Sequence, residues 1–193
     1  MKKAILILHE IYGINPFIKE VCQQYLENGF DVFCPNLIKH QSFSYNQSEE
    51  AYRHFISNIG FDVYLDIEKT IQHLKAKYDK VFVLGFSIGA TIAWRCSVNS
   101  MCDGIIGCYG SRIRDYTDLN PNCPTLLLFA KETPFDVKSL SDRLKTKNLV
   151  ETYEFSANHG FLDHHSQFYN IQASENAKRL ISDFITQQIN TNC

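Results

Sequence analysis

The chain has no large excess of charge of either sign. Its 193 residues include 19 basic and 21 acidic side chains, which give a formal net charge of −2. A nucleic-acid-binding domain usually carries a basic face, and an acidic tail is the usual sign of a solvating segment. The sequence has neither feature, so its charge predicts no nucleic-acid partner.

The chain also lacks a long hydrophobic run at its start. Two lysines are followed by only five apolar residues, 4–8, before His9. This run is too short for the core of a signal peptide and far too short to span a bilayer. We therefore expect no membrane association and a cytoplasmic location.

The seven cysteines include no C-x-x-C pair, and their number is odd. Cys34 and Cys108 fall inside apolar runs, where a free thiol behaves as a small hydrophobic side chain. No set of candidate metal ligands has a recognisable spacing in the sequence. We expect a reduced protein without disulfides, metal or cofactor.

What the sequence does contain is a regular alternation of strand and helix patterns. Apolar runs predict six strands, at residues 3–8, 31–34, 81–85, 105–109, 125–130 and 150–155. Periodic apolar residues predict helices at about residues 16–28, 49–59, 62–77, 90–98, 137–147 and 173–189. Near-continuous apolar strands are typical of a parallel sheet covered on both faces. The prediction is one α/β domain over residues 1–193, with a doubly wound, mostly parallel sheet of about six strands and helices on both faces.

One pentapeptide, Gly85-Phe86-Ser87-Ile88-Gly89, indicates chemistry. It follows the G-x-S-x-G nucleophile-elbow pattern, between an apolar strand and a helical segment. Such a sharp turn leaves no room for a Cβ two residues before or after the serine, which explains both glycines. The pattern predicts Ser87 as a nucleophile, and the alternative is a tight turn with a solvated serine.

Polar residues follow other strands as well. In α/β sheets, reacting groups gather beyond the carboxyl ends of the strands. An acidic loop at 131–136 follows the fifth predicted strand, and His159 follows the sixth. Serine, then acid, then histidine is the chain order of α/β-hydrolases, so His159 is the predicted general base. We expect His164 and His165 to be solvated residues of the next loop.

Together these residues resemble the dienelactone hydrolase family of α/β-hydrolases. The matching stretches occur in the family's order, at residues 9–18, 85–89, 107–110, 123–129 and 153–161. The resemblance implies an α/β-hydrolase core without a large cap that cleaves an ester or a lactone. The family often has cysteine as its nucleophile, and here that position is Ser87.

The chain departs from the family in three ways. Thr133 stands where the family's loop after the fifth strand has its triad aspartate. Asp163 stands four residues after His159, where dienelactone-cleaving members have an arginine, and an acid there would repel a substrate carboxylate. The chain also starts almost directly at the strand before His9, so we expect the family's extra N-terminal strands to be missing.

The sequence leaves the acidic member of the triad open. Its task is to orient the imidazole and to stabilise the imidazolium cation. Asp136 is the first choice, because a different course of the loop would turn it toward His159. Glu132 is the second choice and has a longer reach. Asp115, after the fourth predicted strand, is the third.

An oxyanion hole needs two N–H donors. Ile88 follows the nucleophile at a helix N-terminus and is the predicted first donor, and Ile11 is the predicted second. In the family Glu10 lies near the nucleophile, where a carboxylate would hold the resting side chain or position water. The alternative for Glu10 is a buried acid paired with Arg53 or Arg95.

Tyr109 and Phe161 are expected to line the substrate pocket, with simple packing as the alternative. The sequence thus predicts a serine hydrolase of small esters or lactones, with an acyl-enzyme formed on Ser87. The alternative function is a catalytically impaired hydrolase-fold protein that binds a small ligand or partner, and Thr133 is the residue that favours it.

Overall fold

Six parallel strands form one sheet in the computed structural model, which describes residues 1–98, 101–132 and 135–191. The strands are β1 (Lys3–Leu8), β2 (Asp31–Phe33), β3 (Lys80–Phe86), β4 (Gly104–Cys108), β5 (Thr125–Lys131) and β6 (Val150–Asn158). Their order in the sheet is β2-β1-β3-β4-β5-β6. The order reverses between β1 and β3, which is where open α/β sheets place their ligands.

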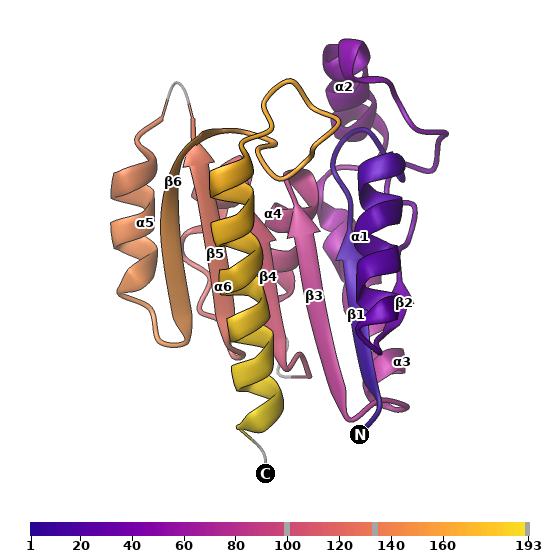
Figure 1. Cartoon of the computed structure of the whole chain (residues 1–193), viewed down its shortest axis with the longest axis vertical. Coiled ribbons are helices and arrows are strands. Elements are labelled where there is room, and N and C mark those ends of the chain that lie inside the picture. The colour runs from indigo at the N-terminus through magenta and orange to yellow at the C-terminus, as the bar shows by residue number, and fades with distance from the viewer. Residues whose placement is uncertain (99–100, 133–134, 192–193) are drawn as a thin grey trace.

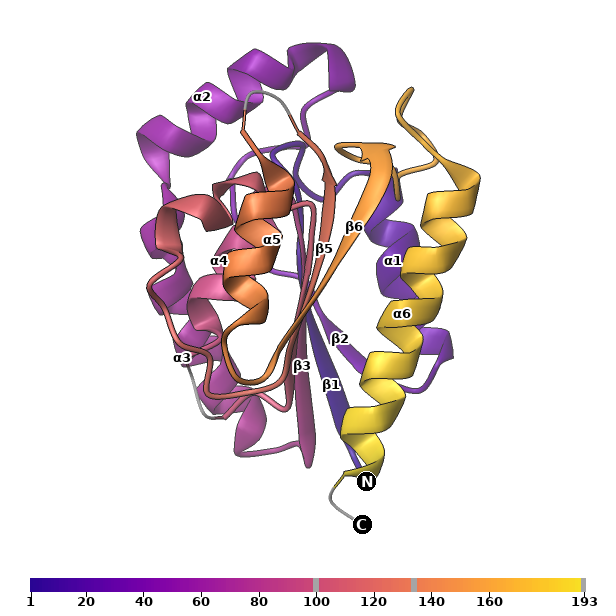
Figure 2. The same cartoon turned by 90° about the vertical axis from the view of Figure 1, so that its left-hand side faces the viewer.

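Helices cover both faces of the sheet (Figures 1 and 2). The helices are α1 (Pro16–Glu27), α2 (Ser48–Asn58), α3 (Tyr64–Lys75), α4 (Ile88–Cys96), α5 (Val137–Lys145) and α6 (Ile171–Asn190). Helices α1 and α6 lie on one side, and the other four lie on the opposite side (Figure 2). The predicted doubly wound α/β fold is therefore confirmed.

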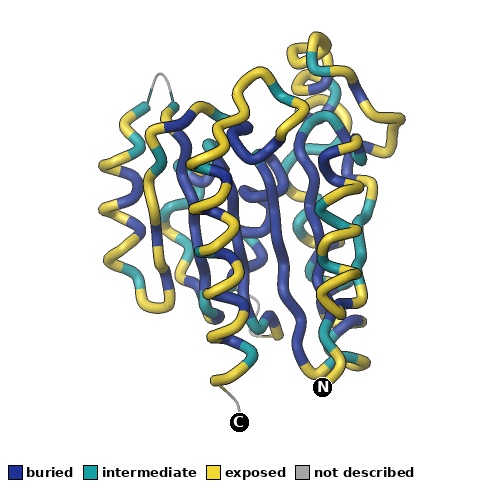
Figure 3. Tube along the Cα trace, in the orientation of Figure 1, coloured by how far each residue is buried: buried dark blue, intermediate teal, exposed yellow. Residues whose placement is uncertain are grey.

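The apolar pattern of the strands follows from this double coverage. All residues of β3 and β4 are buried, because these central strands have helices on both faces (Figure 3). Ile5 and Phe82 contribute to the core beneath α1 and α6, whereas Leu6 and Val83 contribute to the core on the other face. The edge strand β6 instead alternates between buried and exposed positions in its first half.

Side-chain caps mark the starts of three of the six α-helices, α1, α5 and α6. Asn15 caps α1, since its side chain accepts a hydrogen bond from the N–H of Ile18 (3.0 Å), and Pro16 occupies the first helical position. The predicted helix at 62–77 is a 3-10 turn (Phe61–Val63) followed by α3. Helix α4 begins at Ile88, earlier than the predicted start at residue 90, because the elbow passes directly into the helix.

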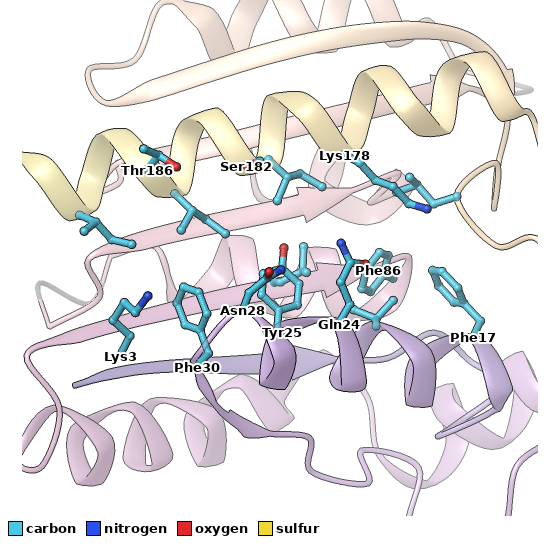
Figure 4. A pocket seen from close by; sticks show the side chains of 16 residues that line it. Lys3, Phe17, Gln24, Tyr25, Asn28, Phe30, Phe86, Lys178, Ser182 and Thr186 are labelled. Carbon is cyan, nitrogen blue, oxygen red and sulfur yellow. The ribbon is translucent and has the colours of Figure 1, made fainter. Parts of the chain in front are cut away.

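A cavity of about 290 Å³ separates α1 from α6 above the sheet (Figure 4). Its walls combine apolar and polar side chains, and Lys3 and Lys178 lie toward its two ends. It contains none of the residues predicted to carry chemistry. In the described part of the chain no helix is both long and apolar enough to cross a membrane. The six cysteines that the structure describes are free thiols.

Candidate active site

Ser87 lies at the junction of β3 and α4 in a backbone conformation that serine rarely adopts. Its φ is +53° and its ψ is −113°, so it lies outside the helix that it caps. A Cβ on Gly85 would overlap the backbone of Gly89, and a Cβ on Gly89 would overlap the carbonyl group of Leu8. The two glycines therefore allow the turn that presents the serine at the strand end.

The imidazole of His159 lies between Ser87 and an acid. Its Nε2 is 2.8 Å from Oγ of Ser87, and its Nδ1 is 2.5 Å from Oε1 of Glu132. The histidine follows β6, and the acid follows β5. With the proton of the neutral ring on Nδ1, Nδ1 donates to the carboxylate and Nε2 accepts from the hydroxyl. Serine, base and acid thus form one continuous hydrogen-bonded chain.

The structure does not bring Asp136, the first choice for the acid, to His159. Asp136 caps α5: its carboxylate accepts hydrogen bonds from the N–H (3.2 Å) and the hydroxyl (2.5 Å) of Ser139. Hydrogen bonds from Ser139 hold the pKa of this exposed acid below its usual value. Asp115, the third choice, pairs with Arg112 at 3.3 Å. The second choice, Glu132, occupies the place beside the imidazole, and Thr133 lies outside the described residues.

Two adjoining cavities share Ser87, His159 and Ile11. The larger, of about 350 Å³, is lined by Ile11, Tyr52, Ser87, Ile88, Thr91, Ser111, Arg112, Arg114, Glu132 and His159. The smaller, of about 120 Å³, is lined by Glu10, Ile11, Tyr12, Tyr45, Ser87, His159, Gly160, Asp163, Ser166 and Phe168. Two arginines thus flank the serine on one side, and two buried acids flank it on the other.

Glu10 is buried in the smaller cavity, and within the described residues no ion pair is formed with its carboxylate. Burial raises its pKa to about 7, partly offset by the nearby His159 and Tyr109. Its Oε1 has no hydrogen bond of good geometry among the described residues. The alternative in which Glu10 pairs with Arg95 is wrong, because Arg95 pairs with Asp62 at 2.8 Å. Arg53 lines a different cavity. Glu10 is therefore an acid that changes charge near neutral pH beside the candidate nucleophile.

Tyr109 and Phe161 do not line either cavity, which corrects their predicted role in substrate binding. Both rings are almost completely buried, and their centroids lie 5.5 Å apart. The Tyr109 ring is 5.0 Å from the ring of His159. The Tyr109 ring packs against the imidazole and the Phe161 ring packs against Tyr109, so both rings support the position of His159 from the core.

Ile11 and Ile88, the predicted backbone donors, both line the larger cavity beside the serine. Ile88 is the first residue of α4, so its N–H has no acceptor within the helix. Ile11 follows β1 and lines both cavities. Their positions are compatible with an oxyanion hole at the N-terminal end of α4.

Asp163, which stands at the family's arginine position, joins two segments that border the site. It is buried, and its Oδ2 accepts a hydrogen bond from the hydroxyl of Tyr45 at 2.5 Å. Its Oδ1 accepts from the N–H of His165 at 2.9 Å. Tyr45 belongs to a 3-10 helix (Tyr45–Gln47) directly before α2. No motif indicated this contact, because the two residues are 118 positions apart.

Both ring nitrogens of His9 are hydrogen-bonded to backbone groups, so this residue has a structural role. Its Nε2 accepts the N–H of Leu37 at 2.9 Å, and its Nδ1 donates to the carbonyl of Glu10 at 2.6 Å. Burial lowers its pKa to about 4, so it stays neutral at physiological pH. It thereby fixes the backbone that carries Glu10.

Sequence reasoning missed several lining residues of the larger cavity. Thr91 lies one turn along α4 from Ser87, a spacing that could have indicated it. Arg112 and Arg114 lie in the 3-10 helix after β4 (Ser111–Tyr116), which carries no recognisable motif.

Comparison with known proteins agrees with this geometry. The sequence matches the profile of the dienelactone hydrolase family over residues 1–189. The chain belongs to the dienelactone hydrolase family. Among curated relatives, the Bacillus subtilis protein YczH is 36% identical over 173 residues, which cover 88% of this chain and 85% of YczH. Carboxymethylenebutenolidase 1 of Cupriavidus pinatubonensis is 28% identical over 130 residues; the match covers 61% of this chain and about half (54%) of that enzyme.

Solved structures support the dienelactone hydrolase fold. A Klebsiella pneumoniae protein provisionally named a dienelactone hydrolase superposes with a TM-score of 0.79 at 16% identity, over 96% of this chain and 87% of that one. An identity this low shows the fold alone. Family membership identifies the chain as a hydrolase of ester bonds.

Proposed function

We propose that this dienelactone hydrolase family member is a serine hydrolase that cleaves small esters or lactones through an acyl-enzyme on Ser87. The observation that carries the proposal is the 2.8 Å contact between Oγ of Ser87 and Nε2 of His159. A free serine hydroxyl is a poor nucleophile, and a base at hydrogen-bond distance is what activates it.

In this proposal His159 removes the proton of Ser87 as the oxygen attacks the carbonyl carbon. The imidazolium that forms is oriented and stabilised by Glu132, whose Oε1 lies 2.5 Å from Nδ1. The same imidazolium then protonates the leaving alkoxide. In the second half of the reaction, His159 deprotonates a water molecule that attacks the acyl-enzyme and releases the acid.

The negative charge on the tetrahedral intermediate is assigned to the backbone N–H groups of Ile88 and Ile11. Ile88 lies at the start of α4, where the helix dipole favours an anion. A cavity of about 350 Å³ beside Ser87 is large enough for a small ester and lies near the lower limit of ligand pockets. Small substrates are therefore the class that the site fits.

We assign Glu10 to the site as well. With a pKa raised to about 7 it holds a proton for part of the neutral range, and a protonated carboxyl can donate a hydrogen bond to a substrate or a water in the smaller cavity. The alternative function, a binding protein without turnover, was based on Thr133, which stands where the family has its triad aspartate. Glu132 supplies the carboxylate that this alternative takes to be missing.

Steady-state hydrolysis of p-nitrophenyl acetate and of a simple lactone tests the proposal. Ser87→Ala and His159→Ala should each lower kcat/KM by at least about 10⁴-fold, as in other triads. Ser111→Ala is the matched control, because Ser111 lines the same cavity, whereas the described hydrogen-bond partners of the imidazole are Ser87 and Glu132; it should stay within about threefold of wild type. Wild-type-like rates in Ser87→Ala would overturn the proposal.

A further inference from the structure

Three side chains that bind transition metals meet on the surface beside the loop that follows β6. Glu20 lies on α1, and His164 and His165 lie between β6 and α6. One potential ligand atom from each of the three side chains lies within 4.8 Å of the other two. In the described ranges of the chain, no other group of three His, Cys, Asp or Glu side chains meets this criterion. We propose that this Glu20–His164–His165 cluster binds a divalent transition-metal ion of the Zn²⁺ class.

Both imidazoles direct the same nitrogen toward the one carboxylate. Nε2 of His164 is 3.2 Å from Oε2 of Glu20, and Nε2 of His165 is 3.0 Å from Oε1. The two imidazole ring centroids are 4.1 Å apart. Zinc binds imidazole nitrogen and carboxylate oxygen at about 2.0–2.2 Å. Two ligand atoms at this distance from a tetrahedral ion lie about 3.3 Å apart, which is close to the two N···O distances in the cluster. On binding, each neutral imidazole presents an unprotonated Nε2 to the ion and keeps its proton on Nδ1.

The backbone that presents the two histidines is fixed by buried groups. The N–H of His165 donates to Oδ1 of Asp163 at 2.9 Å, and the other oxygen of Asp163 accepts from Tyr45. The N–H of Ser166 donates to the carbonyl of Asp163 at 3.0 Å, which closes a turn. The third ligand lies on a regular helix. The ion therefore has to order three exposed side chains but not the backbone that carries them, which favours affinity.

The donor set selects the class of ion. Two imidazole nitrogens and one carboxylate suit Zn²⁺ and its neighbours Co²⁺, Ni²⁺ and Cu²⁺, whereas Ca²⁺ and Mg²⁺ prefer oxygen ligands alone. Three protein ligands leave a position for water. None of the three residues lines the cavities that contain Ser87. We therefore expect a bound ion to fasten the loop that carries His159 to α1 and to raise stability.

The sequence alone could not reveal this cluster. His165 and Glu20 are 145 positions apart, so no ligand spacing of the usual kind exists. The adjacent histidines look like solvated loop residues until the fold places α1 beside the loop; the loop crosses the top of the sheet toward α1 in Figure 1.

Calorimetric titration of the chelator-treated full-length protein with Zn²⁺ tests the proposal. We expect one ion per chain with a dissociation constant in the micromolar range. Glu20→Gln, His164→Ala and His165→Ala should each weaken binding at least tenfold. Glu27→Gln, on the same helix, and His73→Ala, an exposed histidine on α3, are matched controls and should bind within twofold of wild type.

Thermal unfolding gives an independent readout. Zn²⁺ at about 100 times its dissociation constant should raise the Tm by about 5–10 °C in wild type and in the two controls but not in the three ligand variants. Absence of binding, or binding that survives in all three ligand variants, would overturn the proposal. Thiolate-to-metal charge transfer in the spectrum of the Co²⁺ form would also overturn it, because it would place the ion on cysteines.

Discussion

Oε1 of Glu132 lies 2.5 Å from Nδ1 of His159, on the side of the ring opposite Ser87. The acid is one residue earlier in the chain than the family's aspartate position at Thr133. The glutamate side chain is one methylene longer than that of aspartate. Its greater reach compensates for the earlier attachment point, so the carboxylate meets the imidazole from the same strand end.

This contact predicts that Glu132→Gln lowers kcat/KM by about 10³–10⁴-fold with little change in KM. The amide cannot stabilise the imidazolium and favours the wrong tautomer of the ring, as a neutralised aspartate does in other triads. Esterase assays across a substrate series measure both parameters.

Asp136→Ala is the matched control for that variant, because Asp136 is the carboxylate of the same loop that caps α5. It should keep the wild-type kcat/KM and lower the Tm, since the N–H of Ser139 loses its acceptor. The reverse pattern, with activity lost in Asp136→Ala and kept in Glu132→Gln, would show that the acid is misassigned.

How far the sequence predicts this site depends on the range of each interaction. Ser87 and His159 could be located because a motif and a strand end mark each one. The choice between Glu132 and Asp136 depended on the course of a single loop. A local signal was available, since Asp136 stands three residues before Ser139 at the start of a helical pattern, as helix caps do.

The burial of Phe161 and the contact of Tyr45 with Asp163 had no comparable signal. Phe161 follows a strand end just as a lining residue would, and only the packing against Tyr109 shows that its ring turns into the core. Tyr45 meets Asp163 across 118 positions. The first five strands, in contrast, could be predicted to within one residue at each end, because their apolar runs depend on coverage by helices on both faces. The edge strand β6 continues three residues beyond its predicted end at 155, since its half-exposed sequence gives no apolar run to mark the end.

Gly89→Ala should destabilise the fold strongly. A Cβ at Gly89 would overlap the backbone of Leu8, which no rotamer change can relieve. We expect a loss of at least about 2 kcal/mol in the free energy of unfolding, measured in urea. Gly29→Ala is the control: its φ is +77° with open space around it, so it should lose about 1 kcal/mol from backbone strain alone. Equal effects at the two positions would contradict the overlap.

The pH dependence of stability should reveal Glu10. Its pKa is raised by burial from 4.5 to about 7 in the folded protein. Between these values the native state holds a proton that the unfolded state has released, so stability falls as the pH rises. Glu10→Gln should therefore be more stable than wild type at pH 8 by up to about 3 kcal/mol, and the difference should vanish below pH 4.5.

His9 gives the opposite slope, because burial lowers its pKa from 6.5 to about 4. Below pH 6.5 the unfolded state binds a proton that the native state does not, so stability is lost as the pH falls. The two slopes oppose each other in wild type, and Glu10→Gln should expose the slope of His9. Urea unfolding between pH 4 and 8 measures this. A parallel pH profile in wild type and variant would mean that Glu10 ionises normally.

The hydrogen bond between Tyr45 and Asp163 should couple the two segments that it joins. Tyr45→Phe removes a donor from a buried carboxylate, and we expect a loss of about 1–2 kcal/mol in the free energy of unfolding. A double-mutant cycle with Asp163→Asn should give a coupling energy of similar size. Tyr52→Phe, in the larger cavity, is the control and should change stability little. Strict additivity of the two variants would contradict the coupling.

The central claim is that the oxygen of Ser87 is activated by His159, and covalent labelling with a fluorophosphonate tests it most directly. Intact-mass measurement followed by peptide mapping should find one adduct per chain, located on Ser87. The labelling rate should fall by orders of magnitude in His159→Ala. A folded wild-type protein that forms no adduct, or that forms it on another residue, would contradict the account.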